Sequence, residues 1–196
     1  MVDGDNNTTS TFSATNLTLF GLRKKFPGVE NVSTSTLQKW MEPGSEINSE
    51  AGIHHKCSNL LILDTRPEEE YKISHLPGAL RLQPDATDEQ IKSLLEAENA
   101  FNNSSNDDVT RIVCYCSVGY RSSAMATKLM ALQKNNCPSA SSFKTTKIFN
   151  LEGSIFKWAN EGRAMVDYEQ RQTIHAHPYS AIWGKLLNSE LRKSSL

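Results

Sequence analysis

Three short apolar runs, each followed by a stretch with helical periodicity, constrain the fold of this chain most strongly. Leu60 to Leu63 is uninterrupted and ends at Asp64, and the later runs are Arg111 to Tyr115 and Lys147 to Leu151. A continuous run of this length is typical of a strand buried on both faces of a parallel sheet. The helical stretches are Pro67 to Ile73, Thr87 to Glu96, Ser122 to about Leu132 and Ile155 to Glu161. This alternation predicts an α/β domain of three layers, with a mainly parallel central sheet flanked by helices.

The composition changes along the 196 residues and divides them into four parts. Residues 1–18 are mostly Asn, Thr, Ser and Asp, which bury too little apolar surface to offset their ordering entropy, so a disordered arm is predicted. We expect a helical lead-in over 19–50, which holds a short helix from Leu19 to Lys25 and a second helix capped by Ser35. The α/β domain is expected over 51–167. Residues 168–196 form an amphipathic tail that we expect to be helical and to pack on the domain.

Charge and cysteine content narrow the classes of function. The chain has 21 Lys and Arg residues against 22 Asp and Glu residues, so no overall field attracts nucleic acid or an anionic membrane. The four cysteines are irregularly spaced and too few for a small disulfide framework. The N-terminus lacks the basic and apolar regions of a signal peptide, and no stretch reaches the length of a membrane span. We therefore expect a cytoplasmic protein with reduced thiols.

The strongest chemical signal is the segment CSVGYRSS, which starts at Cys116 and lies between a predicted strand and a predicted helix. A loop that curls into a helix N-terminus directs backbone N–H groups and the positive end of the helix dipole at one point. Gly119 supplies the backbone freedom for this curl. A thiol at that point is stabilised as a thiolate, also by Arg121. Cys116 is therefore predicted to be a reactive nucleophile.

Three separated blocks of the sequence resemble the rhodanese family, and in particular its single-domain members. The blocks are Asp64-Thr65-Arg66 with Glu70-Tyr71 and His75-Leu76-Pro77-Gly78-Ala79, the loop from Cys116 to Arg121, and Asn150 to Trp158 with Gly162. With the lead-in FPGVENVSTSTLQKWM, the resemblance spans about residues 26–167, and its blocks stand in the family's order. The chain departs from the common pattern at Ser74 and Ser154, where glycine is frequent, and at Ala164, where proline is frequent.

The resemblance implies a sulfurtransferase. Cys116 would take a sulfane sulfur from thiosulfate or a persulfide donor, hold it as a persulfide, and pass it to a thiol or to cyanide. The implied substrate-binding residues are Ser117, Val118, Gly119, Tyr120 and Arg121, with Arg66 as a weaker candidate. The reaction needs no cofactor and no metal. The implied partners are small sulfur anions and thiol acceptors, a protein thiol among them, and include neither nucleic acid nor membrane.

Two alternatives remain open at this stage. The related cysteine phosphatases and arsenate reductases form one, but their loop is C-x-x-x-x-x-R, whereas Arg121 falls one position earlier relative to Cys116. The other is a non-catalytic rhodanese module that binds a partner or senses redox state, although such a module has usually lost the nucleophile. Because Val118 and Tyr120 stand where some thiosulfate-using members have cations, we expect thiosulfate to be a modest donor and a persulfide of glutathione or of a protein to be better.

Several other polar residues are interpreted as structural. Asp64 and Arg66 are expected to pair or to cap the next helix near the rim of the site, as a surface pair that contributes little. Glu70 and His75 are also taken as structural. Cys114 is either a buried strand residue or a thiol that resolves oxidised Cys116. A metal site is not expected, because neither C-x-x-C nor H-E-x-x-H spacing occurs.

Overall fold

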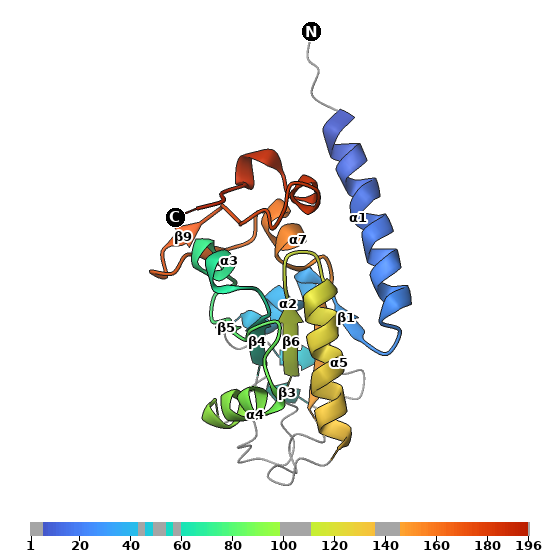
Figure 1. Ribbon diagram of the computed structural model, residues 1–196, viewed down its shortest axis with the longest axis vertical. Coiled ribbons are helices and arrows are strands. Elements are labelled where there is room, and N and C mark those ends of the chain that lie inside the picture. The colour runs from blue at the N-terminus through green and yellow to red at the C-terminus, as the bar shows by residue number, and fades with distance from the viewer. Residues whose placement is uncertain are drawn as a thin grey trace.

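A five-stranded parallel sheet organises the molecule (Figure 1). The computed structural model describes residues 6–42, 46–48, 54–56, 60–98, 111–135 and 146–195. The strands of the sheet are β1 (Glu30–Val32), β4 (Leu60–Asp64), β5 (Leu80–Arg81), β6 (Arg111–Tyr115) and β7 (Lys147–Leu151). Their order is β1-β7-β6-β4-β5, and all four pairings are parallel. The predicted fold class is confirmed.

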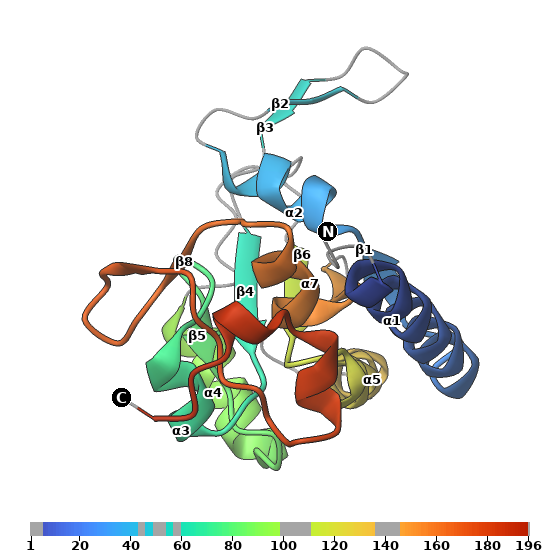
Figure 2. The same ribbon diagram turned by 90° about the horizontal axis from the view of Figure 1, so that it is seen from above.

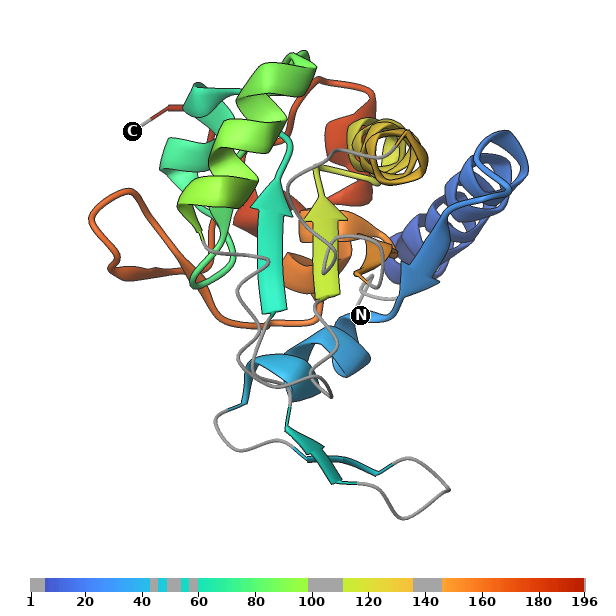
Figure 3. The ribbon, with the colours of Figure 1, turned by 90° about the horizontal axis from the view of Figure 1, so that it is seen from below.

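Helices cover both faces of this sheet (Figure 3). Side chains of β4, β6 and β7 alternate between the two resulting cores. On one face lie α4 (Asp88–Ala97) and α5 (Tyr120–Lys134), which pack on Ile112 and Cys114 of β6. On the other face lie α2 (Thr34–Met41) and α7 (Ser154–Asn160), which pack on Val113 and Tyr115. The helix α3 (Glu68–Ile73) connects β4 to β5. Strands buried on both sides explain the continuous apolar runs in the sequence.

Smaller elements complete the architecture. Two antiparallel pairs lie outside the main sheet, β2 (Glu46–Asn48) with β3 (His54–Lys56) and β8 (Met165–Val166) with β9 (Gln172–Thr173). The polar composition of 99–108 and of 133–145 predicts two loops. Both stretches lie outside the described residues except for 133–135, where α5 continues to Lys134.

The N-terminal region differs from the expected arm and lead-in. A single helix, α1 (Asn6–Lys25), replaces a disordered arm followed by a short helix. Its C-terminal half lies against the domain, where Arg23 pairs with Glu152 and Leu22 approaches Gly119, and these contacts offset the poor helix propensity of the sequence. None of the described helices, α1 included, is long and apolar enough to cross a bilayer.

The lead-in also contributes to the sheet. Glu30 to Val32 form the edge strand β1, which pairs with β7, so the sheet extends beyond the residues expected to carry the α/β domain. The helix α2 begins after Ser33, not at the expected cap Ser35, because the Oγ of Ser33 accepts the N–H of Thr36 at 3.0 Å.

The C-terminal tail is mostly irregular, where a helix was expected. It contains two 3₁₀ helices, η1 (Trp183–Leu186) and η2 (Ser189–Leu191), and it packs on the domain through Ala176 and Leu187, which are fully buried. Figure 2 shows this segment lying over α7 and beside α5. A left-handed backbone at Tyr179, with a φ of 63°, prevents a continuous helix here.

The ion pair between Asp64 and Arg66 is fully buried, which corrects its interpretation as a surface pair. Both side chains have 0% exposure, because α3 and the following turn cover the carboxyl end of β4. The Arg66 Nε donates to Asp64 Oδ1 at 2.8 Å, and Nη2 donates to Asp64 Oδ2 at 2.5 Å and to the carbonyl of Ser74 at 2.6 Å. Burial alone lowers the pKa of Arg66, but the adjacent carboxylate outweighs it and the pKa is raised.

Breaking this buried pair is expected to destabilise the fold. The substitution Arg66→Met leaves the Asp64 carboxylate buried without its counter-charge, which costs about 3–5 kcal/mol in the free energy of unfolding. Urea denaturation measures the change. The matched control is Lys72→Met, which removes an exposed pair with Glu68 and is expected to cost less than about 1 kcal/mol. A similar, small cost for both variants would contradict the buried role of Arg66.

Candidate active site

The candidate nucleophile Cys116 lies where β6 ends and the chain turns into α5. The loop of residues 116–119 joins the two elements, and α5 begins at Tyr120, two residues before the expected start. Gly119 adopts a φ of +117°, a conformation that L side chains rarely adopt. A Cβ at this position would also lie 3.2 Å from Cδ1 of Leu22 on α1. Glycine is therefore required both for the turn and for the approach of α1.

Gly119 and Ser122 contact the sulfur of Cys116. The N–H of Gly119 donates to Sγ at 3.1 Å, and the hydroxyl of Ser122 lies 3.5 Å from Sγ and has a single proton, which Sγ shares with Oδ1 of Asn150 at 2.7 Å. The backbone N–H of Ser122 also contributes. From the sequence, we expect residues 117–121 to surround the sulfur of Cys116. The hydrogen bonds found come from Gly119, within that range, and from Ser122, beyond it. Ser122 was visible in the motif as one of the two serines after Arg121.

These contacts favour the ionised form of Cys116. Burial alone would raise the pKa of its thiol, but the charge of Arg121 and the hydrogen bonds from Ser122 and Gly119 outweigh burial, so the pKa lies below its ordinary value. The N-terminus of α5, a helix of 15 residues, adds the positive end of its dipole. The site is therefore suited to hold an anionic sulfur nucleophile.

Arg121 is itself held by a buried carboxylate. Its Nη1 donates to Oε1 of Glu70 at 2.7 Å and its Nη2 donates to Oε2 at 3.0 Å, in a bidentate pair. The hydroxyl of Ser117 donates to Glu70 at 2.8 Å and accepts from Arg121 at 2.7 Å. Glu70, interpreted from the sequence as structural, thus fixes the loop and balances the charge of Arg121. An anionic ligand would meet little net positive charge.

A second set of hydrogen bonds anchors the loop to β7 and α7. The N–H of Cys116 donates to Oγ of Ser154 at 3.2 Å, and the carbonyl of Cys116 accepts the N–H of Ile155 at 3.1 Å. The hydroxyl of Ser122 lies 2.7 Å from Oδ1 of Asn150. Ser154, one of the departures from the family pattern, therefore supplies an acceptor to the backbone of the nucleophile that glycine would lack.

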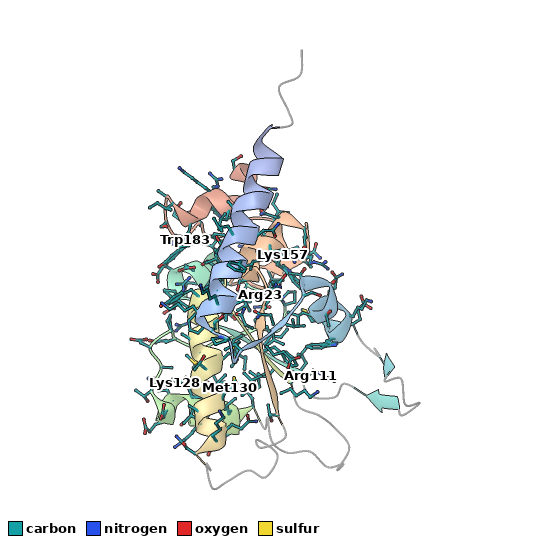
Figure 4. All side chains as sticks on the ribbon, turned by 90° about the vertical axis from the view of Figure 1, so that its right-hand side faces the viewer. Arg23, Arg111, Lys128, Met130, Lys157 and Trp183 are labelled. Carbon is teal, nitrogen blue, oxygen red and sulfur yellow. The ribbon has the colours of Figure 1, made fainter. Side chains whose placement is uncertain are left out.

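Cys116 opens into a cavity of about 240 Å³ rather than directly to solvent. The residue itself is only 1% exposed. The cavity is lined by Cys116, Ser117, Val118, Tyr120 and Arg121 of the loop and α5, Thr18 and Leu22 of α1, and Tyr179 and Trp183 of the tail. Figure 4 shows Trp183 beside α1. No sequence signal identified the four residues of α1 and the tail, because only the tertiary packing of the termini brings them to the loop.

Other residues considered from the sequence lie elsewhere. Arg66 does not line the cavity, which corrects its assignment as a substrate-binding candidate: its guanidinium is committed to Asp64. His75 is stacked on Tyr71, and burial lowers its pKa. Cys114 faces the opposite core, and burial raises the pKa of its thiol, which is consistent with a packed strand residue. Within the described part of the chain, no group of three or more His, Cys, Asp or Glu residues could hold a metal ion.

The family model of the rhodanese-like domain matches residues 49–161 of the chain. The chain belongs to this family. The rhodanese-like segment contains the Cys116 loop, Glu70 and Ser154, whereas Thr18, Leu22, Tyr179 and Trp183 lie outside it. The core of the candidate site thus comes from the family domain, and part of the cavity wall comes from the flanking segments.

Similar solved structures include rhodanese-like proteins of low sequence identity. Ygr203w of Saccharomyces cerevisiae, a homolog of single-domain rhodanese and the Cdc25 phosphatase catalytic domain, is 15% identical, with a TM-score of 0.48 and coverage of 69% of this chain and 82% of its own. A thiosulfate sulfurtransferase from Pseudomonas aeruginosa is 14% identical, with a TM-score of 0.48 and coverage of 85% and 26%. A rhodanese-like domain protein from Staphylococcus aureus is 19% identical, with a TM-score of 0.40 and coverage of 66% and 91%. A search of curated protein sequences finds no match.

Removing the hydroxyl at Ser122 of this rhodanese-like protein is expected to make Cys116 less acidic. In Ser122→Ala the thiolate loses its contact with a hydroxyl whose proton it shares with Asn150, so the midpoint of the pH profile for alkylation by iodoacetamide moves to higher pH. Below that midpoint, the rate is expected to fall by roughly three- to tenfold. Peptide mass spectrometry assigns the modification to Cys116. The control Thr127→Ala removes a hydroxyl that bonds only within α5 and leaves the profile unchanged. An unshifted profile in Ser122→Ala contradicts this role.

The charge balance set by Glu70 gives a further expected result. In Glu70→Gln the charge of Arg121 is no longer balanced, which favours an anionic reagent. The rate of Cys116 alkylation by anionic iodoacetate, divided by the rate with neutral iodoacetamide, is therefore expected to rise by roughly fivefold. The two reagents differ little in size, so the ratio of their alkylation rates reports on the charge at the site. The control Glu68→Gln removes an exposed carboxylate of the same helix and leaves the ratio as in the wild type. No rise in the ratio for Glu70→Gln would mean that Glu70 does not neutralise the site.

Proposed function

We propose that this protein is a sulfurtransferase, which moves a sulfane sulfur from thiosulfate or a persulfide donor to a thiol or cyanide through a persulfide on Cys116. The observation that carries the proposal is the position of Sγ. It accepts a hydrogen bond at the N-terminus of α5, lies near Arg121, and faces a cavity of about 240 Å³. This arrangement stabilises a negatively charged sulfur without any other reactive group.

The reaction proceeds in two displacements. The thiolate of Cys116 attacks the outer sulfur of the donor, the sulfur–sulfur bond of the donor breaks, and the remaining group leaves with the electron pair, as sulfite when the donor is thiosulfate. The product is a Cys116 persulfide anion. An acceptor thiolate or cyanide then attacks the outer sulfur, and the Cys116 thiolate is released. The contacts from Gly119 and Ser122 reach Sγ, so they stabilise the Cys116 thiolate before the first displacement and after the second.

The same geometry disfavours a phosphatase or arsenate reductase. The loop places Arg121 five residues after Cys116, one fewer than in the cysteine phosphatases. The bidentate pair with Glu70 also uses the charge that would otherwise bind a phosphate dianion. A sulfur donor that carries less charge is a better match to this loop.

The proposal predicts a stable sulfur adduct. Incubation with thiosulfate or glutathione persulfide is expected to raise the intact mass by about 32 Da, the mass of one sulfur atom, and cyanide is expected to remove it. The gain is absent in Cys116→Ser and is retained in the matched control Cys114→Ala, which removes the buried neighbouring thiol. If no sulfane donor adds mass at Cys116, or if an aryl phosphate is turned over instead, the proposed function fails.

A further inference from the structure

The part of the cavity wall that lies outside the family domain is mostly apolar. Tyr179 and Trp183 come from the C-terminal tail, and Thr18 and Leu22 come from α1. Tyr120, at the start of α5, packs edge-on against Phe26, with ring centroids 5.4 Å apart. Contact with such a surface does not stabilise bound sulfite or sulfate-like groups. A flat apolar group, by contrast, is stabilised both by burial and by contact between rings.

Tyr179 lies against the loop of the site, although 45% of its surface is exposed. Its φ of 63° is an unfavourable conformation for a non-glycine residue, and its N–H donates to Nδ1 of His177 at 3.1 Å. The guanidinium carbon of Arg121 lies 4.5 Å from the centre of the Tyr179 ring, which places the ring against the cation of the loop. The tail is anchored on either side of Tyr179 by the buried residues Ala176 and Leu187.

The charge of the cavity points to the same class of ligand. Arg121 is the one ionic side chain among the described residues that line it, apart from Cys116 itself. Two hydrogen bonds to Glu70 balance its charge, and the Tyr179 ring covers one of its faces. A dianion such as thiosulfate therefore lacks a counter-charge beside a Cys116 thiolate. The volume of about 240 Å³ lies below that of pockets for drug-sized ligands, so the ligand is small.

We infer that Tyr179 and Trp183 determine donor specificity, and that they favour small sulfane donors with a flat apolar group and a single negative charge. This inference rests on the proposed sulfur transfer. For a thiosulfonate donor, the Cys116 thiolate attacks the terminal sulfur, the sulfur–sulfur bond breaks, and a sulfinate leaves with the electron pair. The Cys116 persulfide keeps one negative charge, so atoms and charge balance.

Three donors separate shape from charge. Benzenethiosulfonate and methanethiosulfonate each carry one negative charge and differ in the apolar group, and thiosulfate carries two. With cyanide as the acceptor, we expect kcat/KM for benzenethiosulfonate to exceed that for methanethiosulfonate by about tenfold, which corresponds to about 1.4 kcal/mol. Thiosulfate is expected to be the poorest of the three donors.

Substitutions in the wall test whether these two residues cause the preference. Tyr179→Gly removes the ring and accepts the left-handed backbone, and Trp183→Ala removes the second ring. Each is expected to lower the ratio of kcat/KM for benzenethiosulfonate to kcat/KM for methanethiosulfonate by roughly three- to fivefold. Intrinsic differences in donor reactivity cancel, because every variant meets the same pair of donors. Tyr179→Phe keeps the ring and is expected to keep the ratio.

Two control variants lie nearby but do not line the cavity. Tyr168→Gly removes an aromatic ring from a residue that is 50% exposed. Ile182→Ala shortens a side chain next to Trp183 in sequence, and Ile182 is 77% exposed. Both are expected to keep the wild-type ratio, and thermal unfolding shows that each variant is folded. An unchanged ratio in both Tyr179→Gly and Trp183→Ala, or a thiosulfate rate above that of benzenethiosulfonate, overturns the inference. If none of the three donors adds sulfur to Cys116, the proposed function itself has failed.

Discussion

The site depends on interactions that favour the ionised form of the Cys116 sulfur, although the residue is only 1% exposed to water. Burial of Cys116 favours the neutral thiol, and only the opposing contributions of Arg121, Ser122 and Gly119 reverse that preference. Those contributions require the loop to curl at Gly119 and α5 to begin immediately after it. Low exposure also increases their effect, because electrostatic interactions are stronger where solvent does not screen them. Burial of Cys116 therefore has two opposite effects: it favours the neutral thiol, and it strengthens the interactions that favour the thiolate.

A polar layer at the carboxyl end of the sheet supports this arrangement. Glu70 holds Arg121 and Ser117, while Ser154 and Asn150 hold Cys116 and Ser122 from the side of β7. Buried polar groups are tolerated only when they are hydrogen-bonded, so each of these bonds also fixes a geometry. The buried pair of Asp64 and Arg66 occupies the same edge at the end of β4. Its residues belong to the family's motif, yet their contribution is to the fold beneath the site rather than to the ligand.

The sequence predicts those features that depend on local pattern. Most residues of β4, β6 and β7 are apolar, so the fold class is readable from the sequence. The loop after β6 combines Cys116, Gly119 and Arg121 within six positions, which marks the candidate nucleophile. The edge strand β1 is too short and too polar to be recognised, because its pairing with β7 rather than its own composition makes it a strand. The burial of Arg66 has the same explanation, since it depends on how α3 covers β4.

The least predictable residues, Tyr179 and Trp183, lie far from Cys116 in sequence and outside the family domain. Their place in the site follows from the packing of the tail on α1 and α7, which no local pattern encodes. A cover of this kind has two physical effects. It excludes water from the sulfur, which strengthens the hydrogen bonds of the loop, and it restricts the space for a donor. In the proposed function, the chemistry of the loop and the selection of its ligand therefore reside in different parts of one chain: the domain core holds the candidate nucleophile, and the terminal segments line part of the cavity beside it.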